Sequence, residues 1–160
     1  MIVGSQLHKI CPTPFSHILC WVDGTEESCR SAERATRLAQ SLDARLSFLA
    51  PGKRLGRSEG FDAYARIEGV SGPMPPVIDS SISDCVDRAM RFAAEYGLEP
   101  AVRVTSSENP VSAICSAARN DGADLIVLGK RPQKLGKPLF SSSMLDRLSN
   151  RCALTVLSAG

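Results

Sequence analysis

The residues best suited to bind an anion lie in one basic segment near the C-terminus. From 129 to 143 the sequence GKRPQKLGKPLFSSS carries four positive charges and no acidic residue. Its three serines precede an amphipathic stretch, where the free N–H groups and the positive dipole end of a helix would attract an anion. The segment therefore predicts a phosphate site. The alternative is a solvated basic loop whose serines only cap the helix.

A second candidate is the carboxylate of Asp23, which directly follows a short apolar run at 17–22. A carboxylate there can accept a hydrogen bond from a ribose hydroxyl or an adenine amine. The alternative is local turn chemistry with Gly24 and Thr25, because aspartate commonly bonds to nearby backbone groups. Both roles stay open at this point.

Patterns typical of catalysis and of metal binding are missing from the sequence. His17 begins an apolar run and His8 lies in the N-terminal stretch, so neither is placed to activate a nucleophile. The P-loop and dinucleotide fingerprints do not occur. The six cysteines form no Cys-x-x-Cys pair, and only Cys11 and Cys20 stand near a histidine. We therefore expect no catalytic residue and no zinc or other metal site.

Five cysteines fall among apolar residues of expected strands and helices. We predict that they are small buried hydrophobic side chains with free thiols in a reducing compartment. Cys11, in the N-terminal extension, is expected to be the most exposed thiol, and it leaves a redox-sensor role open. The five expected to be buried are Cys20, Cys29, Cys85, Cys115 and Cys152.

Length and composition indicate one folded domain. The chain has 160 residues, of which 43% are hydrophobic and 22% charged, near the average for globular proteins. Nineteen basic and seventeen acidic residues leave a net charge of +2, too even a balance to favour nucleic acid or a membrane surface as a partner. The start lacks the pattern of a signal peptide, and no apolar run is long enough to span a membrane, so we expect a cytoplasmic protein.

Short apolar runs alternate with amphipathic stretches along most of the chain. This alternation predicts right-handed crossovers and a parallel sheet between two layers of helices, the α/β class. Residues 1–16 are predicted to be an N-terminal arm, 17–160 the domain, and 51–78 a long Gly/Pro-rich loop within it. The expected strands are 17–22, 44–50, 101–105, 124–129 and 153–158, and the expected helices 26–42, 78–96, 110–122 and 143–150.

Ligands of such sheets bind beyond the carboxyl ends of the strands, where the winding direction reverses. The loops that begin at Asp23, Ala50, Ser106 and Gly129 lie at this edge of the predicted sheet. They are therefore the places where a site is expected.

Three motifs follow one another in a familiar order. They are ILCWVDGTEES at 18–28, NPVSAI at 109–114 and GADLIVLG at 122–129. Together they resemble the universal stress protein family from about residue 16 to residue 158. The resemblance implies a three-layer sandwich with a five-stranded, mainly parallel Rossmann-like sheet of the adenine nucleotide alpha hydrolase type, in the strand order 3-2-1-4-5. It also implies a homodimer through the last strand, Ala153 to Leu157.

The resemblance also implies a nucleotide loop that departs from the family pattern. Members that bind ATP carry Gly-x2-Gly-x9-Gly-[Ser/Thr] after the fourth strand, and these places fall on Gly129, Pro132, Ser142 and Ser143. Pro132 has no N–H and a fixed φ, and Ser142 adds a Cβ where the backbone would approach phosphate. By the resemblance, Asp23 and Ala50 match the adenosine side, and Gly129, Arg131, Ser142 and Ser143 the phosphate side. Lys130 and Lys137 of the basic segment are further candidates to contact the phosphates.

The function that the resemblance implies is a non-catalytic regulatory or protective dimer in stress responses. The altered loop would make it a poor ATP binder that requires no cofactor. The alternative is a sensor of ATP or another adenine nucleotide with at most slow ATP hydrolysis, in which the nucleotide itself holds most of the Mg²⁺. Neither nucleic acid nor a membrane is an expected partner.

Overall fold

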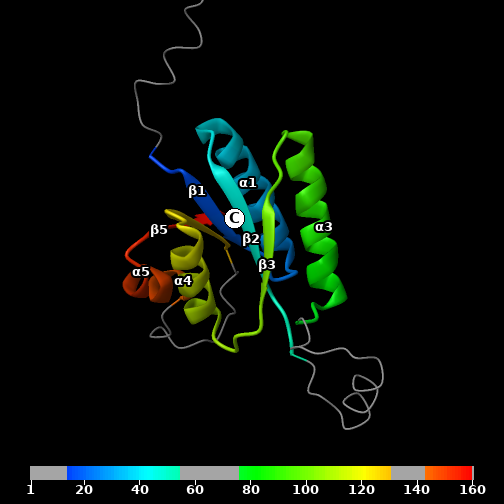
Figure 1. Cartoon of the computed structure of the whole chain (residues 1–160). Helices are drawn as coiled ribbons and strands as arrows, with labels where there is room; N and C mark the ends of the chain where they lie inside the picture. Colours follow the sequence, from blue (N-terminus) through cyan, green and yellow to red (C-terminus); the bar gives the residue numbers. More distant parts are fainter. Residues whose placement is uncertain (1–13, 55–75, 131–142, 160) are drawn as a thin grey trace, which may run out of the picture.

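A computed structural model describes residues 14–54, 76–130 and 143–159 of the chain. Five parallel strands form one sheet in the order β3-β2-β1-β4-β5, as the resemblance implied. Helices connect successive strands and cover both faces of the sheet (Figure 1). The elements are β1 (His17–Trp21), α1 (Glu26–Leu42), β2 (Arg45–Pro51), α3 (Ser80–Glu95), β3 (Ala101–Thr105), α4 (Pro110–Asp121), β4 (Leu125–Gly129), α5 (Met144–Arg151) and β5 (Thr155–Ala159).

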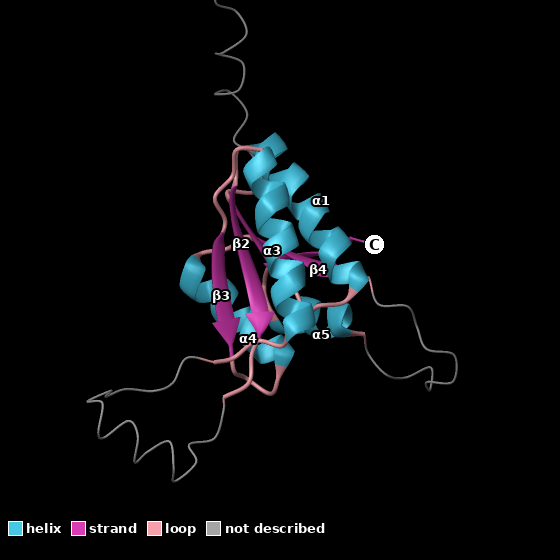
Figure 2. Cartoon of the chain, turned by 90° about the vertical axis from the view of Figure 1, so that its right-hand side faces the viewer, coloured by secondary structure: helices cyan, strands magenta, loops and turns pink. Residues whose placement is uncertain are grey.

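The central strands are apolar on both faces, and alternate side chains enter two separate cores. Ile18 and Cys20 of β1 pack with α1 and α3, whereas Leu19 and Trp21 pack with α4 and α5. Figure 2 shows α1 and α3 together in front of the sheet. Continuous apolar runs such as 17–22 are thus explained, because helices bury both faces of a parallel sheet.

The helix ends follow the predicted capping pattern. The Thr25 side chain accepts a hydrogen bond from the Ser28 N–H at the start of α1. Asn109 does the same for Ser112, with proline in the first turn of α4. These caps satisfy N–H groups that a helix leaves free, so the boundaries are set locally by sequence.

Most predicted boundaries shift by one or two residues. The helix expected at 78–96 spans 80–95, and the last strand, expected at 153–158, begins two residues later, at Thr155. Phe15 packs against the core and Ser16 bonds to Asp124, so the end of the predicted arm already contacts the domain. Lys53 and Val77, near the two ends of the predicted loop at 51–78, form an antiparallel bridge.

The prediction of five free thiols was wrong for four of them. All five cysteines are buried as expected, yet Cys29 is bonded to Cys85 and Cys115 to Cys152. Among the described residues only Cys20 is a free cysteine. Partners 56 and 37 residues apart in the chain meet because each lies on the inward side of its segment, a proximity that spacing alone does not reveal.

His17 lies at the amino-terminal edge of the sheet, opposite the predicted site. His17 is buried, with Nε2 2.7 Å from Oγ of Ser47 and Nδ1 3.0 Å from the carbonyl oxygen of Asp121. The Asp124 carboxylate accepts hydrogen bonds from the N–H of His17 and from the N–H and hydroxyl of Ser16. Both side chains therefore stabilise the fold at the edge opposite the predicted site.

Candidate functional site

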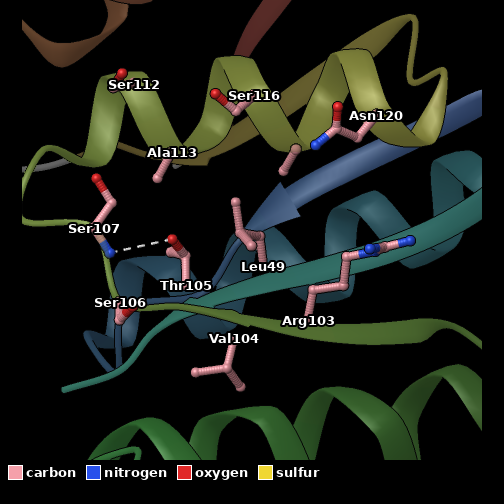
Figure 3. Close-up of a pocket in the computed structure, with 11 residues that line it drawn as sticks. Leu49, Arg103, Val104, Thr105, Ser106, Ser107, Ser112, Ala113, Ser116 and Asn120 are labelled. Carbon is pink, nitrogen blue, oxygen red and sulfur yellow. Dashed lines mark hydrogen bonds between the residues drawn. The ribbon is translucent and has the colours of Figure 1, made fainter. Parts of the chain in front are cut away.

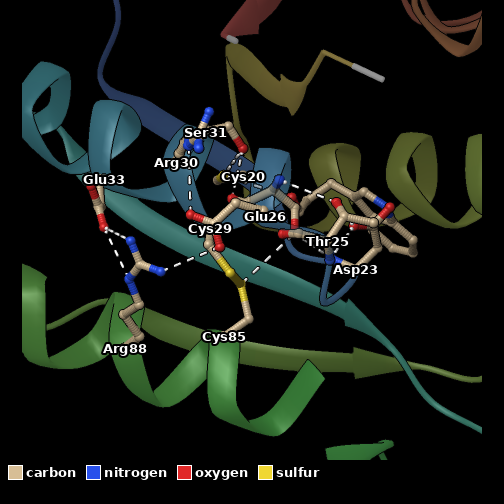
Figure 4. The surroundings of a disulfide bond; sticks show 12 residues. Cys20, Asp23, Thr25, Glu26, Cys29, Arg30, Ser31, Glu33, Cys85 and Arg88 are labelled. Atoms are coloured by element: carbon tan, nitrogen blue, oxygen red, sulfur yellow. Dashed lines mark hydrogen bonds and ion pairs between the residues drawn. A yellow bond between two sulfur atoms is a disulfide. The ribbon is translucent and has the colours of Figure 1, made fainter. Parts of the chain in front are cut away.

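Asp23 lies in the turn that leads from β1 to α1, and its carboxylate is engaged within that turn (Figure 4). Oδ1 accepts hydrogen bonds from the Thr25 hydroxyl at 2.6 Å and from the Thr25 N–H at 3.2 Å. The Asp23 N–H donates in turn to the hydroxyl of Ser28, at 3.3 Å. These bonds are the local turn chemistry that the sequence offered as one role of Asp23, and the side chain remains partly exposed.

Gly129, at the end of β4, packs directly on the start of α1. A Cβ built there would lie 2.8 Å from the carbonyl carbon of Glu27 and the nitrogen of Ser28, so a side chain does not fit. Because β1 and β4 are paired neighbours, this contact brings the end of β4 next to the Asp23 turn. The end of β4 and the Asp23 turn therefore lie next to each other, and glycine is needed at 129 for packing whether or not phosphate binds.

The other described residues of the predicted site are less open to a ligand. The Ala50 side chain is fully buried in the core shared with α1 and α3. Ser143 caps α5 through a capping box: its hydroxyl and N–H donate to the Asp146 carboxylate at 2.8 and 3.1 Å. Lys130 is exposed at the end of β4. Arg131, Lys137 and Ser142, with Pro132 of the motif, lie outside the described residues.

The acidic residue of this capping box changes the electrostatics of the helix start. The segment 129–143 contains no acid, but Asp146 follows within the first turn and places a carboxylate at the N-terminal end of α5. A carboxylate at this end already satisfies the helix dipole and a free N–H group, and it repels a phosphate. The serine-cap alternative is therefore confirmed for Ser143.

A polar groove that the sequence did not reveal lies between β3 and α4. It has a volume of about 510 Å³ and opens at the carboxyl end of β3, where Thr105, Ser106 and Ser107 lie. Figure 3 shows β3 on one side and α4 on the other. Its polar lining consists of Arg103, Thr105, Ser106, Ser107, Ser112, Ser116 and Asn120, over an apolar floor that includes Leu49, Ala113 and Ala117.

Arg103 is the one charged residue among those that line this groove, and an ion pair holds its side chain in place. Nη2 of Arg103 lies 2.7 Å from Oδ1 of Asp121, whose side chain is only 4% exposed, while that of Arg103 is 57% exposed. Neither Asp121 oxygen accepts another hydrogen bond from the described residues. The buried carboxylate thus fixes the guanidinium at one end of the groove and leaves most of it in contact with solvent.

Sequence reasoning found only one residue of the groove. Ser106 belongs to a loop at the expected edge, whereas the helix side was overlooked. Ser112, Ser116 and Asn120 recur at steps of four on α4, and these steps place them on one face of the helix. This periodicity of hydroxyl and amide groups was a signal that was available in the sequence.

The described residues contain neither an evident general base nor a metal-binding cluster at this edge. No group of three or more His, Cys, Asp or Glu residues is arranged to hold a metal ion within the described part. Burial, with a smaller contribution from the charge of Asp23, raises the pKa of the Cys20 thiol to about 12, which keeps it protonated. The hydroxyl, amide and guanidinium groups of the described residues can bind polar ligands.

Comparison with known proteins gives the following matches. The model of the universal stress protein family matches residues 14–158. No curated protein matches the sequence. Among solved structures, a universal stress protein in complex with cAMP aligns with a TM-score of 0.66 and 18% identity, over 91% of this chain and 97% of the other.

Two further structures show the same fold. The universal stress protein UspA from Lactobacillus plantarum aligns with a TM-score of 0.64 and 17% identity, over 91% of this chain and 97% of that one. A universal stress protein from Archaeoglobus fulgidus in complex with dAMP gives 0.57 and 13%, over 91% and 98%. At these identities the likeness establishes the architecture and not the ligand.

Proposed function

The chain belongs to the universal stress protein family, and from this premise we propose that it is a non-catalytic regulatory or protective dimer in which ATP binding is weak. It acts in the cytoplasm through protein contacts and requires no cofactor. Within the described residues, no helix is both long and apolar enough to cross a membrane.

One observation carries the proposal of weak ATP binding. Two of the three described polar side chains that would frame the nucleotide, Asp23 and Ser143, are hydrogen-bonded inside their own turns, to Thr25 and Asp146. A ligand would have to compete with these short-range bonds before gaining any from the protein. The altered loop adds to this cost, since Pro132 lacks an N–H group that phosphate could use.

The edge strand β5 supports the dimer. It pairs with β4 on one side only, and it exposes Leu157, which is 43% accessible. An unpaired apolar edge favours pairing with a second copy of the same strand. The opposite edge strand, β3, offers a comparable residue, Val102 at 40%, and thus a matched control.

The dimer is tested by Leu157→Asp, measured by light scattering at micromolar concentration. A charge on the pairing strand should convert the dimer to a monomer without unfolding it. Val102→Asp, at the other edge, should remain dimeric. A wild-type monomer, or a dimer that is lost only in Val102→Asp, would reject β5 as the interface.

A second candidate function is adenine-nucleotide sensing with at most slow hydrolysis. Relatives of the same fold are seen with cAMP and dAMP. The β3–α4 groove adds the hydroxyl groups of its Thr105–Ser107 end at the same edge as Asp23, while the Arg103 guanidinium lies at the other end of the groove, beside Asp121. Such groups can bond a ribose and a phosphate, with any Mg²⁺ held mainly by the nucleotide.

Thermal unfolding with ATP, AMP and cAMP separates the two candidates. A nucleotide at a hundred times its Kd should stabilise the protein by about 2.7 kcal/mol. The sensor requires such a shift, and Arg103→Ala should reduce it. If the altered loop weakens binding, Pro132→Gly with Ser142→Gly should strengthen ATP binding in calorimetry. Unchanged binding in that double variant would reject the loop as the cause.

A further inference from the structure

Each helix layer contains one disulfide, and the two bonds have different surroundings. Cys29–Cys85 joins α1 to α3, and Cys115–Cys152 joins α4 to the residue that ends α5. All four cysteines are buried, with exposures of 8% or less. A reductant can therefore reach either bond only when the helix around it opens locally.

The bond between α1 and α3 is supported by many other contacts. The two helices are 17 and 16 residues long and bury seven and five residues, respectively. Arg88 of α3 also reaches across to α1, with Nη2 2.8 Å from Oε1 of Glu33. Local opening here would break this packing together with the ion pair, so Cys29 and Cys85 should stay protected.

The bond to the end of α5 has few such supports. This helix has eight residues, and Leu148 is its one buried residue. Cys152 is itself buried, but its neighbours Arg151 and Ala153 are exposed. Short segments with few buried contacts open at a lower free-energy cost than long packed helices. Within the described residues, the disulfide is the one covalent link between α5 and α4, beside the packing of Leu148, Met144 and Leu145 in the core shared with α4.

We propose that Cys115–Cys152 is a reversible redox latch on α5, which a dithiol reductant opens before Cys29–Cys85. A thiolate of the reductant attacks one sulfur, forms a mixed disulfide and releases the other cysteine as a thiolate. The second thiol of the reductant then displaces the first protein sulfur. Two electrons and two protons pass to the protein, which becomes a dithiol, and the reductant leaves as its own disulfide.

The one free cysteine among the described residues does not interfere with this exchange. Cys20 is fully buried on β1 and remains protonated, so it supplies no thiolate to attack either disulfide. The two bonds should consequently open and close as separate pairs. In a cytoplasmic protein, disulfides are typically transient or redox-sensing, which fits a latch better than a permanent cross-link.

The position of α5 connects the latch to the strand proposed to form the dimer. The helix begins at the end of the basic segment, and β5 starts three residues after Cys152. Releasing α5 would loosen the strand proposed to form the dimer. This second step rests on the proposed function, whereas the order of reduction does not.

The order of reduction is tested on the oxidised full-length chain. Samples are treated with dithiothreitol, quenched by alkylation at successive times and mapped by mass spectrometry. Cys115 and Cys152 should be reduced at least about tenfold faster than Cys29 and Cys85, because the shorter helix opens at a lower free-energy cost. Simultaneous opening of the two pairs, or prior labelling of Cys29 and Cys85, would overturn the latch.

Two matched variants test its effect on structure. Replacing both Cys115 and Cys152 by serine should speed hydrogen exchange at 143–159 and leave α1 and α3 unchanged. Replacing Cys29 and Cys85 should leave 143–159 unchanged. Unaltered exchange at 143–159 in the first variant would also overturn the latch.

Light scattering of the first variant then separates the two steps. Loss of a dimer that the wild type forms would support control of β5 by the latch. A retained dimer would overturn that control. A wild type that is monomeric when oxidised would overturn the proposed dimer, and the latch would then be judged by exchange and labelling alone.

Discussion

The two edges of the sheet are both rich in polar residues, but they bury them to different degrees. At the amino-terminal edge the side chains of His17, Ser47 and Asp121 are each about 4% exposed. At the carboxyl edge Asp23 is partly exposed, and the groove opens beside Ser107. One edge uses polar groups to join strands to loops, and the other leaves them accessible to a ligand.

The glycines at the two edges of the sheet also differ in their surroundings. Gly97 and Gly122, at the amino-terminal edge, have positive φ, and a Cβ added at either would meet nothing within 4 Å, so they serve the helix ends. At Gly129, on the carboxyl edge, the backbone of α1 leaves no room for a side chain. Gly97 and Gly122 thus serve chain reversal alone, Gly129 serves close packing, and Gly24 in the Asp23 turn combines a positive φ with a close neighbour.

The largest effect is expected at the amino-terminal edge, from Asp124→Asn. Burial opposes ionisation of this carboxyl, but hydrogen bonds from Ser16 and His17 outweigh burial and lower its pKa. A lowered pKa stabilises the fold above the pKa of the unfolded chain and loses this effect as pH falls through the folded value. The variant should lose about 1–3 kcal/mol of unfolding free energy at pH 7.

Urea unfolding across pH tests this assignment. The gap between wild type and Asp124→Asn should shrink as the pH falls below about 4, because the wild-type carboxylate becomes protonated there. Asp84→Asn, at an exposed position on α3, is the control and should show little change. A gap that stays constant down to pH 2 would mean that hydrogen-bond geometry, and not charge, accounts for the loss.

A similar or slightly smaller effect is expected at the carboxyl edge, from Gly129→Ala. The added Cβ would lie 2.8 Å from the backbone of α1, so the helix start must move. Overpacking of this kind costs about 1–3 kcal/mol. Gly97→Ala is the matched variant, with open space but a φ of 72°, and should cost about 1 kcal/mol.

Chemical denaturation combined with hydrogen exchange distinguishes the two glycines. Gly129→Ala should speed exchange in the first turn of α1, next to Asp23, whereas Gly97→Ala should affect only the end of α3. Equal losses, with no change near Asp23, would contradict close packing as the reason for glycine at 129.

The fold could be predicted from sequence because its determinants are local. Continuous apolar runs located the strands, and caps such as Thr25 and Asn109 located two helix starts. The last strand was placed two residues early because Ala153 and Leu154 are apolar, although hydrogen bonding to β4 begins only at Thr155. Strand pairing depends on residues far apart in the sequence, so a run of apolar residues predicts the ends of a strand only approximately.

The candidate site was predictable only in outline. The meeting of the Asp23 and Gly129 loops follows from strand order, and the resemblance supplied that order. Neither the pairing of the cysteines nor the Arg103–Asp121 ion pair follows from it, because both join side chains of elements whose relative rotation is set by packing. By contrast, the bond from Thr25 to Asp23 is the local turn chemistry that the residues Asp23-Gly24-Thr25 already suggested.

The smallest effect is expected from Thr25→Ala, and it addresses what the carboxyl edge is for. The change removes the helix cap and the 2.6 Å bond to Asp23, and should cost about 1 kcal/mol of stability. Thr25→Ser keeps the hydroxyl and should stay within a few tenths of a kcal/mol of wild type. Calorimetry with AMP then gives the functional result. If the hydroxyl competes with a ribose for Asp23, AMP should bind more tightly to Thr25→Ala than to Thr25→Ser. Equal affinities would assign the Asp23 carboxylate to the turn alone, and both edges of the sheet would then use their buried and half-buried carboxylates for structure.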